Sequence, residues 1–242
     1  MRVGLFVTCL VDMMRPRIGF AALKLLEAAG CEVVVPETQT CCGQPGYNAG
    51  DYESARALAL KLVEEFKDCE YVVVPSGSCG GMIRTHYSSL FDKQVDLQIK
   101  VSKLAERTYE LTDFLTRVAK LDKVPAKFDG TLTYHDSCSG LRELGVCNQP
   151  RDLIAKTGAQ LVEMQHAQTC CGFGGTFSVK YGDISARMAD KKCESIKKTG
   201  AGAIAAGDLG CLLNIEGRLR RLGDESTRVL HVAEILAGEN EA

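Results

Sequence analysis

The pentapeptide Gln-Thr-Cys-Cys-Gly occurs twice in the chain, as Gln39-Thr40-Cys41-Cys42-Gly43 and, at an offset of 129, as Gln168-Thr169-Cys170-Cys171-Gly172. The same offset relates Cys9 to Cys138, and 31 residues separate each of these cysteines from its doublet. Farther along, the offset grows slightly and two more matches follow in the same order: Ser54-Ala55-Arg56 with Ser185-Ala186-Arg187, and Cys79 with Cys211. Ordered matches of this kind indicate an internal repeat.

The repeat divides the chain of 242 residues into two homologous halves. We predict a first half at residues 1–118, a linker at 119–127 and a second half at 128–242, because Pro125 and Gly130 mark a connection between them. A chain of this length can bury a sizeable core.

Short runs rich in β-branched and apolar residues recur in both halves, at 2–8, 31–36 and 71–75 and again at 131–134, 160–164 and 203–206. The segments between them carry helical periodicity, as in Ala57-Leu58-Leu60-Leu62-Val63. Strands that alternate with helices imply a parallel sheet covered on both faces. The predicted fold is therefore α/β, with two halves related by a pseudo-twofold axis, each a small parallel sheet flanked by helices.

The repeated cysteines follow the predicted strands, at the carboxyl ends where ligands collect in sheets of this kind. Each half supplies a single cysteine after its first strand, a doublet after its second and another single cysteine after its third. We therefore predict two metal or cofactor sites, formed by Cys9, Cys41, Cys42 and Cys79 in the first half and by Cys138, Cys170, Cys171 and Cys211 in the second.

Composition narrows the class of protein. With 29 basic and 31 acidic side chains, the net charge is -2, which does not favour binding to nucleic acid. No apolar run approaches the roughly 18 residues of a membrane span. The apolar run at residues 3–11 ends at Asp12 without a small-residue cleavage site, so we expect a buried strand and a cytoplasmic location. Thiols stay reduced in that compartment, which makes metal binding the leading explanation for twelve cysteines.

Four thiolates per half match either one tetrahedral zinc ion or one iron–sulfur cluster. Zinc sites usually take their cysteines in tight C-x2-C pairs, whereas these ligands come from three distant segments and include an adjacent pair. Adjacent side chains point apart, which suits a cluster better than a single ion. We therefore favour iron–sulfur, with zinc and a metal-free chain as the alternatives.

The remaining four cysteines have different expected roles. Cys31 and Cys69 precede strands, at the opposite edge of the sheet, and Cys193 lies within a predicted helix. We expect these three to be small buried apolar residues. Cys147 lies nine residues past Cys138, close enough in sequence to reach the same site.

The cysteine pattern, given twice, resembles the CCG cysteine-rich domain found in heterodisulfide reductase and in the iron–sulfur subunits of glycolate oxidase and anaerobic glycerol-3-phosphate dehydrogenase. Longer strings resemble one group within this family, which acts in lactate oxidation. These strings are Phe6-Val7-Thr8-Cys9, Cys41-Cys42-Gly43-Gln44-Pro45, Gly77-Ser78-Cys79, residues 170–178 and Cys211-Leu212-Leu213-Asn214-Ile215.

The resemblance implies an iron–sulfur redox subunit of a complex that oxidises L-lactate to pyruvate, a subunit of an oxidoreductase rather than a complete enzyme. It implies up to two clusters, expected to be [4Fe-4S], and two partner subunits, of which one is ferredoxin-like. Two other functions remain open. One is a thiol-disulfide oxidoreductase resembling heterodisulfide reductase, and the other is a zinc-stabilised interaction protein.

One departure from the family pattern concerns the ligands. The family's last cysteine belongs to a C-x2-C pair, and Ser76 and Asp208 replace the first cysteine of that pair here. An ordinary cube is therefore at least as plausible as the non-cubane cluster of heterodisulfide reductase. Ser76 and Asp208 are additional candidate ligands through oxygen.

Two further side chains are candidates for chemistry at the second site. His135 is a candidate proton donor, or a hydrogen-bond partner that tunes a cluster. Arg142 is a candidate partner for a substrate carboxylate.

Glycine-rich loops at residues 43–50 and 172–178 carry three aromatic side chains, Tyr47, Phe173 and Phe177. Such side chains either dock a partner chain or shield the clusters from water.

Overall fold

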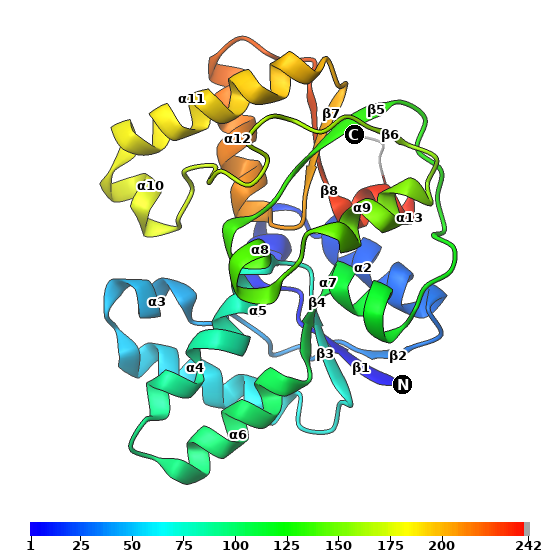
Figure 1. Cartoon of the computed structure of the whole chain (residues 1–242). Coiled ribbons are helices and arrows are strands. Elements are labelled where there is room, and N and C mark those ends of the chain that lie inside the picture. The colour runs from blue at the N-terminus through cyan, green and yellow to red at the C-terminus, as the bar shows by residue number, and fades with distance from the viewer. Residues whose placement is uncertain (240–242) are drawn as a thin grey trace.

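Two four-stranded parallel sheets organise the computed structural model, which describes residues 1–239 (Figure 1). The first sheet has the order β2-β1-β3-β4 and the second the order β6-β5-β7-β8. The strands of the first sheet are β1 (Arg2–Leu5), β2 (Glu32–Val34), β3 (Tyr71–Val74) and β4 (Thr108–Glu110). Those of the second are β5 (Thr131–His135), β6 (Gln160–Leu161), β7 (Ala203–Ala206) and β8 (Arg228–His231).

Helices surround both sheets. In the first half they are α1 (Cys9–Met14), α2 (Arg17–Ala28), α3 (Gln44–Ala49), α4 (Tyr52–Glu65), α5 (Gly77–Gly81), η1 (Met82–His86), η2 (Ser88–Phe91), α6 (Val95–Glu106), α7 (Leu111–Asp113) and η3 (Phe114–Val118). In the second half they are α8 (Cys138–Leu144), α9 (Asn148–Ala155), α10 (Thr176–Lys180), α11 (Gly182–Thr199), α12 (Leu209–Arg221) and α13 (Val232–Ala237). The predicted α/β fold with two repeated halves is confirmed.

Strand register reproduces the sequence repeat. Val3 of β1 pairs with Tyr71 of β3, and Leu132 of β5 pairs with Ala203 of β7. These partners are related by offsets of 129 and 132, the same offsets that relate the cysteines following each strand. The repeated cysteines therefore leave the two sheets at equivalent positions.

Local sequence explains where several helices begin and end. The Asp51 side chain accepts a hydrogen bond of 3.1 Å from the backbone N–H of Ser54 and so caps the start of α4. Gly200 ends α11 in the left-handed conformation, with φ of 66°, which a residue with a side chain rarely adopts. Apolar side chains line one face of α2, which packs into the core.

The terminal helices of each half pack on the other half. Helix α13, which ends the second half, packs on α2 of the first, and α7 of the first half packs on α9 of the second (Figure 1). Apolar side chains of both sheets, among them Leu5 and Val73 of the first and Leu132 and Ile204 of the second, belong to one continuous core. The two halves therefore share one core, while a second cluster of buried residues, which includes Phe6, Leu62 and Val72, lies within the first half alone.

Residues 119–130 form turns and irregular backbone between η3 and β5. This segment includes the predicted linker at 119–127, whose boundaries stay a prediction. Among the described helices, none is both long and apolar enough to cross a membrane.

Candidate metal sites between the two halves

The four cysteines predicted for the first site come together; we call them the first tetrad. Cys9 is the first residue of α1, Cys41 and Cys42 lie in the loop before α3, and Cys79 lies within α5. The Sγ atoms of Cys42 and Cys79 are 3.4 Å apart. Cys41 contacts both Cys9 and Cys42, so the thiols form a continuous chain.

The second tetrad repeats this arrangement. Cys138 is the first residue of α8, Cys170 and Cys171 lie in the loop before α10, and Cys211 lies within α12. Cys170 contacts Cys138 and Cys171, and Cys171 contacts Cys211. All twelve cysteines are free thiols, so neither tetrad is closed by disulfides.

Crowding of the thiols perturbs their ionisation. Hydrogen bonds from Cys42 and Cys9 lower the pKa of Cys41 to about 2. The hydrogen bond to Cys41, and then burial, raises the pKa of Cys9. The hydrogen bond to Cys170, and then burial, likewise raises the pKa of Cys138. All four sulfurs of a tetrad can become thiolates together only if a positive charge compensates them. Such a donor set fits a thiolate-bound metal ion or an iron–sulfur cluster.

Close helix packing places both tetrads at the interface between the halves. Helix α5, which carries Cys79, packs on α8, which begins with Cys138. A Cβ atom added to Gly77 would lie 2.9 Å from the backbone nitrogen of Gly140, so this crossing needs glycine. Helices α1 and α12, which carry Cys9 and Cys211, also contact each other across the interface.

Asp208 and Ser76 cap the helices that carry the last cysteine of each tetrad. Asp208 Oδ1 accepts hydrogen bonds from the backbone N–H groups of Gly210 and Cys211 at the start of α12. Its Oδ2 reaches the other half, where it accepts from Ser76 Oγ at 3.1 Å and from the Ser78 N–H at 2.8 Å. These oxygens therefore hold the two helix ends together, and their predicted role as iron ligands stays a prediction.

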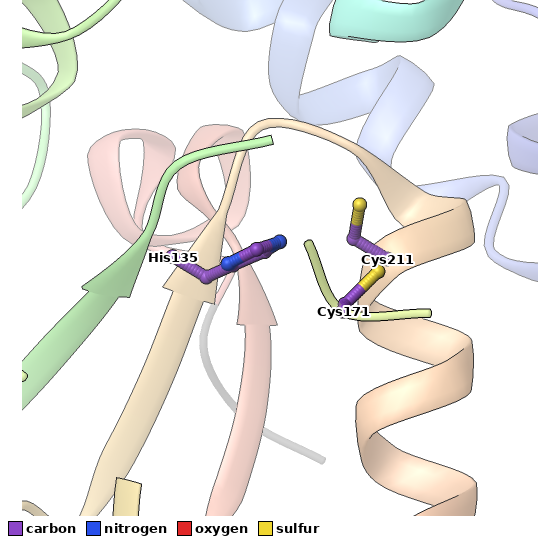
Figure 2. A group of neighbouring side chains, drawn as sticks. All are labelled: His135, Cys171 and Cys211. Atoms are coloured by element: carbon purple, nitrogen blue, oxygen red, sulfur yellow. The ribbon is translucent and has the colours of Figure 1, made fainter. Parts of the chain in front are cut away.

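His135 lies beside the second tetrad. Its side chain is completely buried, and its Nδ1 lies 3.2 Å from the carbonyl oxygen of Ala167. The ligand atoms of His135, Cys171 and Cys211 all lie within 4.8 Å of one another (Figure 2). Burial, followed by the nearby Lys192 charge, lowers the pKa of His135 to about 3, which keeps the ring neutral.

Two other candidates lie differently. Arg142 is exposed and lies outside the linings of the three cavities that open at the tetrads, and its role with a substrate carboxylate stays a prediction. Cys147 precedes α9, with its Sγ 4.0 Å from Nη1 of Arg151. Cys31, Cys69 and Cys193 are buried apolar residues, as predicted.

Three cavities open at the tetrads. One of about 420 Å³ is lined by Cys9 and Cys41 of the first tetrad. Two others, of about 380 Å³ at the first tetrad and about 240 Å³ at the second, adjoin each other. They share lining residues, which are Gln44, Asn48, Ser78, Phe173, Gly175 and Asp208. Phe173 is half-buried and packs over the start of α12, where a Cβ added to Gly210 would lie 2.4 Å from its ring. Of the three loop aromatics, Phe173 is therefore the one that lines both of these cavities, and its role in shielding or docking stays a prediction.

The other two loop aromatics are also half-buried. Tyr47 packs on Tyr52 and His86, with ring centroids 5.6 and 5.1 Å apart. Phe177 packs on Tyr181 at 5.5 Å.

Two repeated lysines escaped the sequence prediction. Lys192 is buried, and its Nζ donates to the carbonyl oxygens of His166 at 2.6 Å and Ala167 at 3.2 Å. Lys61, its counterpart in the first half, donates to the carbonyl oxygen of Thr38. Each lysine therefore holds, by hydrogen bonds to backbone carbonyl groups, the segment that precedes the cysteine doublet of its own half. The sequence repeat could have identified this pair, because the offset of 131 between Lys61 and Lys192 also relates the two Ser-Ala-Arg strings.

The chain matches the family model of the cysteine-rich CCG domain twice, at residues 3–84 and 132–216. It is 47% identical over 237 residues to lactate utilization protein A of Bacillus cytotoxicus, which covers 98% of both chains. It is also 47% identical to lactate utilization protein A of Bacillus subtilis, over 98% of this chain and 99% of that one.

Among solved structures, a hypothetical protein from Helicobacter pylori superposes with a TM-score of 0.70 at 12% identity. That match covers 99% of this chain and 48% of the Helicobacter chain, and it shows a shared fold only.

Both family matches begin within the first strand of a half and include all four cysteines of the corresponding tetrad. The two lactate utilization A proteins each align over 98% of this chain. The chain therefore belongs to the CCG cysteine-rich domain family and, within it, to the family of the lactate utilization A proteins.

Proposed function

We propose that each cysteine tetrad holds a [4Fe-4S] cluster and that the chain is the iron–sulfur electron-transfer subunit of a cytoplasmic complex that oxidises L-lactate to pyruvate. The observation that carries this proposal is the pair of repeated tetrads, each with four free thiols in mutual contact. The names of the relatives support the lactate part of the proposal.

Ligand geometry supports a cluster over a zinc ion. Each tetrad draws its sulfurs from three separate segments, and two of the four come from adjacent residues. Structural zinc sites typically use compact pairs of cysteines a few residues apart. The wider spread of ligands in this chain suits a larger centre.

The chemistry of lactate oxidation supports a need for partner subunits. Lactate gives up two electrons, normally as a hydride or its equivalent, whereas a bound iron–sulfur cluster would supply one-electron transfer. The sequence contains neither a G-x-G-x-x-G motif nor a P-loop. We therefore propose that this chain works with two other subunits, of which one is ferredoxin-like.

The protein's own residues would protect and position the centres. Phe173, which lines a cavity at each tetrad, would limit the access of water. Asp208 and Ser76 fix the starts of the helices that carry Cys211 and Cys79.

Anaerobic purification tests the proposal. We expect visible absorption that dithionite bleaches, and lactate oxidation only when the partner subunits are added back to the isolated chain. A colourless protein with stoichiometric zinc would contradict it in favour of a zinc-stabilised interaction protein. Reduction of a disulfide substrate, without lactate oxidation in the complete complex, would instead support a thiol-disulfide oxidoreductase.

A further inference from the structure

The two tetrads differ in one buried neighbour. His135, the last residue of β5, lies beside the second tetrad, and Phe6 occupies the equivalent position after β1. The repeat fixes this correspondence, because Cys138 and Cys9 each follow three residues later. Phe6 is completely buried and packs edge-on against Phe66, with ring centroids 6.1 Å apart. The first tetrad therefore has an apolar neighbour where the second has an imidazole.

The hydrogen bond to Ala167 defines which nitrogen of His135 carries the proton. A carbonyl oxygen can only accept, so Nδ1, at 3.2 Å, is the nitrogen that donates to it. The neutral ring then has a lone pair on Nε2 and no proton there. This Nε2 is buried and has no hydrogen-bond partner among residues 1–239.

The His135 ring lies beside two cysteines of the second tetrad. Figure 2 shows the His135 ring extending from the end of β5 toward Cys171 and Cys211, the two tetrad members with which it forms a compact group of ligand atoms. A buried lone pair without a partner is costly. Coordination to a metal would satisfy it, and metal-bound histidines almost always donate their other N–H to a carbonyl or carboxylate oxygen, as His135 does.

We propose that Nε2 of His135 is a fifth ligand atom of the second metal centre, so that four sulfurs and one nitrogen hold this centre while four sulfurs alone hold the first. This inference rests on the proposed function, because it requires a metal centre at the second tetrad. It makes the two centres chemically unequal although the cysteines repeat.

The repeated lysines show the same inequality. Lys61, in the first half, pairs with Glu65 at 2.7 Å. Ile196 occupies the position equivalent to Glu65 in the second half, and it is buried. Lys192 instead lies close enough to Cys171 and Cys211 for their charges to act on it. The Asp208 carboxylate acts on Cys138 and Cys211 in the opposite sense to Lys192. The expected higher reduction potential of the second centre therefore rests on the neutral nitrogen ligand.

The test uses the full chain, purified anaerobically with histidine labelled with nitrogen-15. A Cys42→Ala background removes the first centre, so that pulsed electron paramagnetic resonance of the reduced protein reports only the second. We expect coupling from a histidine nitrogen, and its loss in His135→Cys with the iron of the second centre retained. His166→Asn is the matched control, because His166 is exposed and its backbone, at φ of 60°, suits asparagine. It should leave the coupling unchanged.

Two further measurements keep the test decisive if one variant behaves poorly. In the otherwise unchanged chain, His135→Ala should lose iron from the second centre to a chelator faster than the unchanged chain, and His135→Cys should shift that centre's reduction potential to a more negative value. A reduced second centre without nitrogen coupling, or with coupling that survives His135→Cys, would overturn the inference and leave the proposed function standing. A chain that binds no reducible metal would instead overturn the proposed function.

Discussion

Asp208 is a side chain that joins the two halves beside the cysteine tetrads. One carboxylate oxygen caps α12, and the other accepts hydrogen bonds from Ser76 and Ser78 of the opposite half. The bonds to Ser76 and to the start of α12 are buried, whereas the bond from Ser78 is partly buried beside the cavities. These hydrogen bonds account for a buried carboxylate after β7, and they do not require Asp208 to bind a metal.

Asp208→Asn tests the hydrogen bonds between the halves while it keeps an oxygen that can cap α12. One oxygen remains to cap α12, while the amide NH2 meets the Ser78 N–H, so a donor faces a donor. Leaving that partly buried donor without its acceptor should lower the free energy of unfolding by about 1–3 kcal/mol. Thermal unfolding measures the loss. Ser76→Ala removes the cap of α5 as well as the bond to Asp208 and should cost a comparable amount, about 0.5–2 kcal/mol. Unchanged thermal unfolding of Asp208→Asn would contradict the assigned role of Asp208.

Glu110, at the end of β4, is a buried acid that the sequence pattern did not single out. Burial raises its pKa to about 7, although hydrogen bonds from Thr112 and Asp113 oppose the shift. Its Oε1 has no hydrogen-bond partner in the described chain. Because the folded-state pKa lies above the unfolded value, the unfolded chain loses this proton first and stability falls as the pH rises from about 4.5 to about 7.

Glu110→Gln should remove this pH-dependent penalty. Glutamine keeps an acceptor for the N–H groups of Thr112 and Asp113 and cannot ionise. Near pH 4 the variant and the unchanged chain should unfold at similar temperatures. At pH 8 the variant should be more stable by a few kcal/mol at most, on the order of 3 for the full shift. A difference that stays constant between these two pH values would contradict the prediction.

At the scale of elements, Phe173 and Phe177 lie in one short segment but have different surroundings. Phe173 lines a cavity at each tetrad and packs over the start of α12, whereas Phe177 packs on Tyr181. Phe173→Ser should therefore open both sites to water and speed the loss of iron in air. Phe177→Ser should retain iron, with any defect confined to assembly with partner subunits. Iron content followed over time in air, beside a binding assay, checks both variants, and faster iron loss in Phe177→Ser would contradict this division of roles.

The sequence predicted the three strands of each half that precede the cysteines, and it missed the fourth strand of each sheet. Short apolar runs located β1, β2, β3, β5, β6 and β7, and β7 has the predicted bounds. Both β4 and β8 escaped prediction because each is an edge strand of three or four residues, too short for a period-two pattern to stand out. Their positions depend on pairing with β3 and β7, which no local signal encodes.

The sequence predicted the membership of each tetrad and could not predict its surroundings. The repeat alone selected the eight cysteines that meet in space. The orientation of His135 depends on a carbonyl oxygen 32 residues away, and the contacts of Asp208 cross from one half to the other. Such contacts follow from tertiary packing, so no sequence motif predicts them.

At the scale of the whole molecule, α13 packs on α2 and α9 packs on α7, across the boundary between the halves. This packing implies that the halves do not fold separately. The buried face of α2 includes Ile18, Leu25 and Leu26, and α13 of the other half packs on this helix. A fragment of residues 1–118 would lose the cover that α13 gives to α2 and that α9 gives to α7. Each leucine or isoleucine left in water costs about 1.5–3 kcal/mol, a large share of the stability of a small domain. We expect this fragment to lack cooperative unfolding in circular dichroism, and a fragment that unfolds cooperatively would contradict the shared core.

The central claim is that two independent cysteine tetrads each hold one metal centre. Iron and sulfide counted per chain in four anaerobically purified variants test it most directly. Cys42→Ala and Cys171→Ala should each remove about half of the bound iron, because each doublet serves only its own tetrad. Cys31→Ala and Cys69→Ala, at buried positions outside both tetrads, should retain all of it. Equal loss of iron in all four variants, or stoichiometric zinc in the unchanged chain when iron is freely available, would contradict the claim.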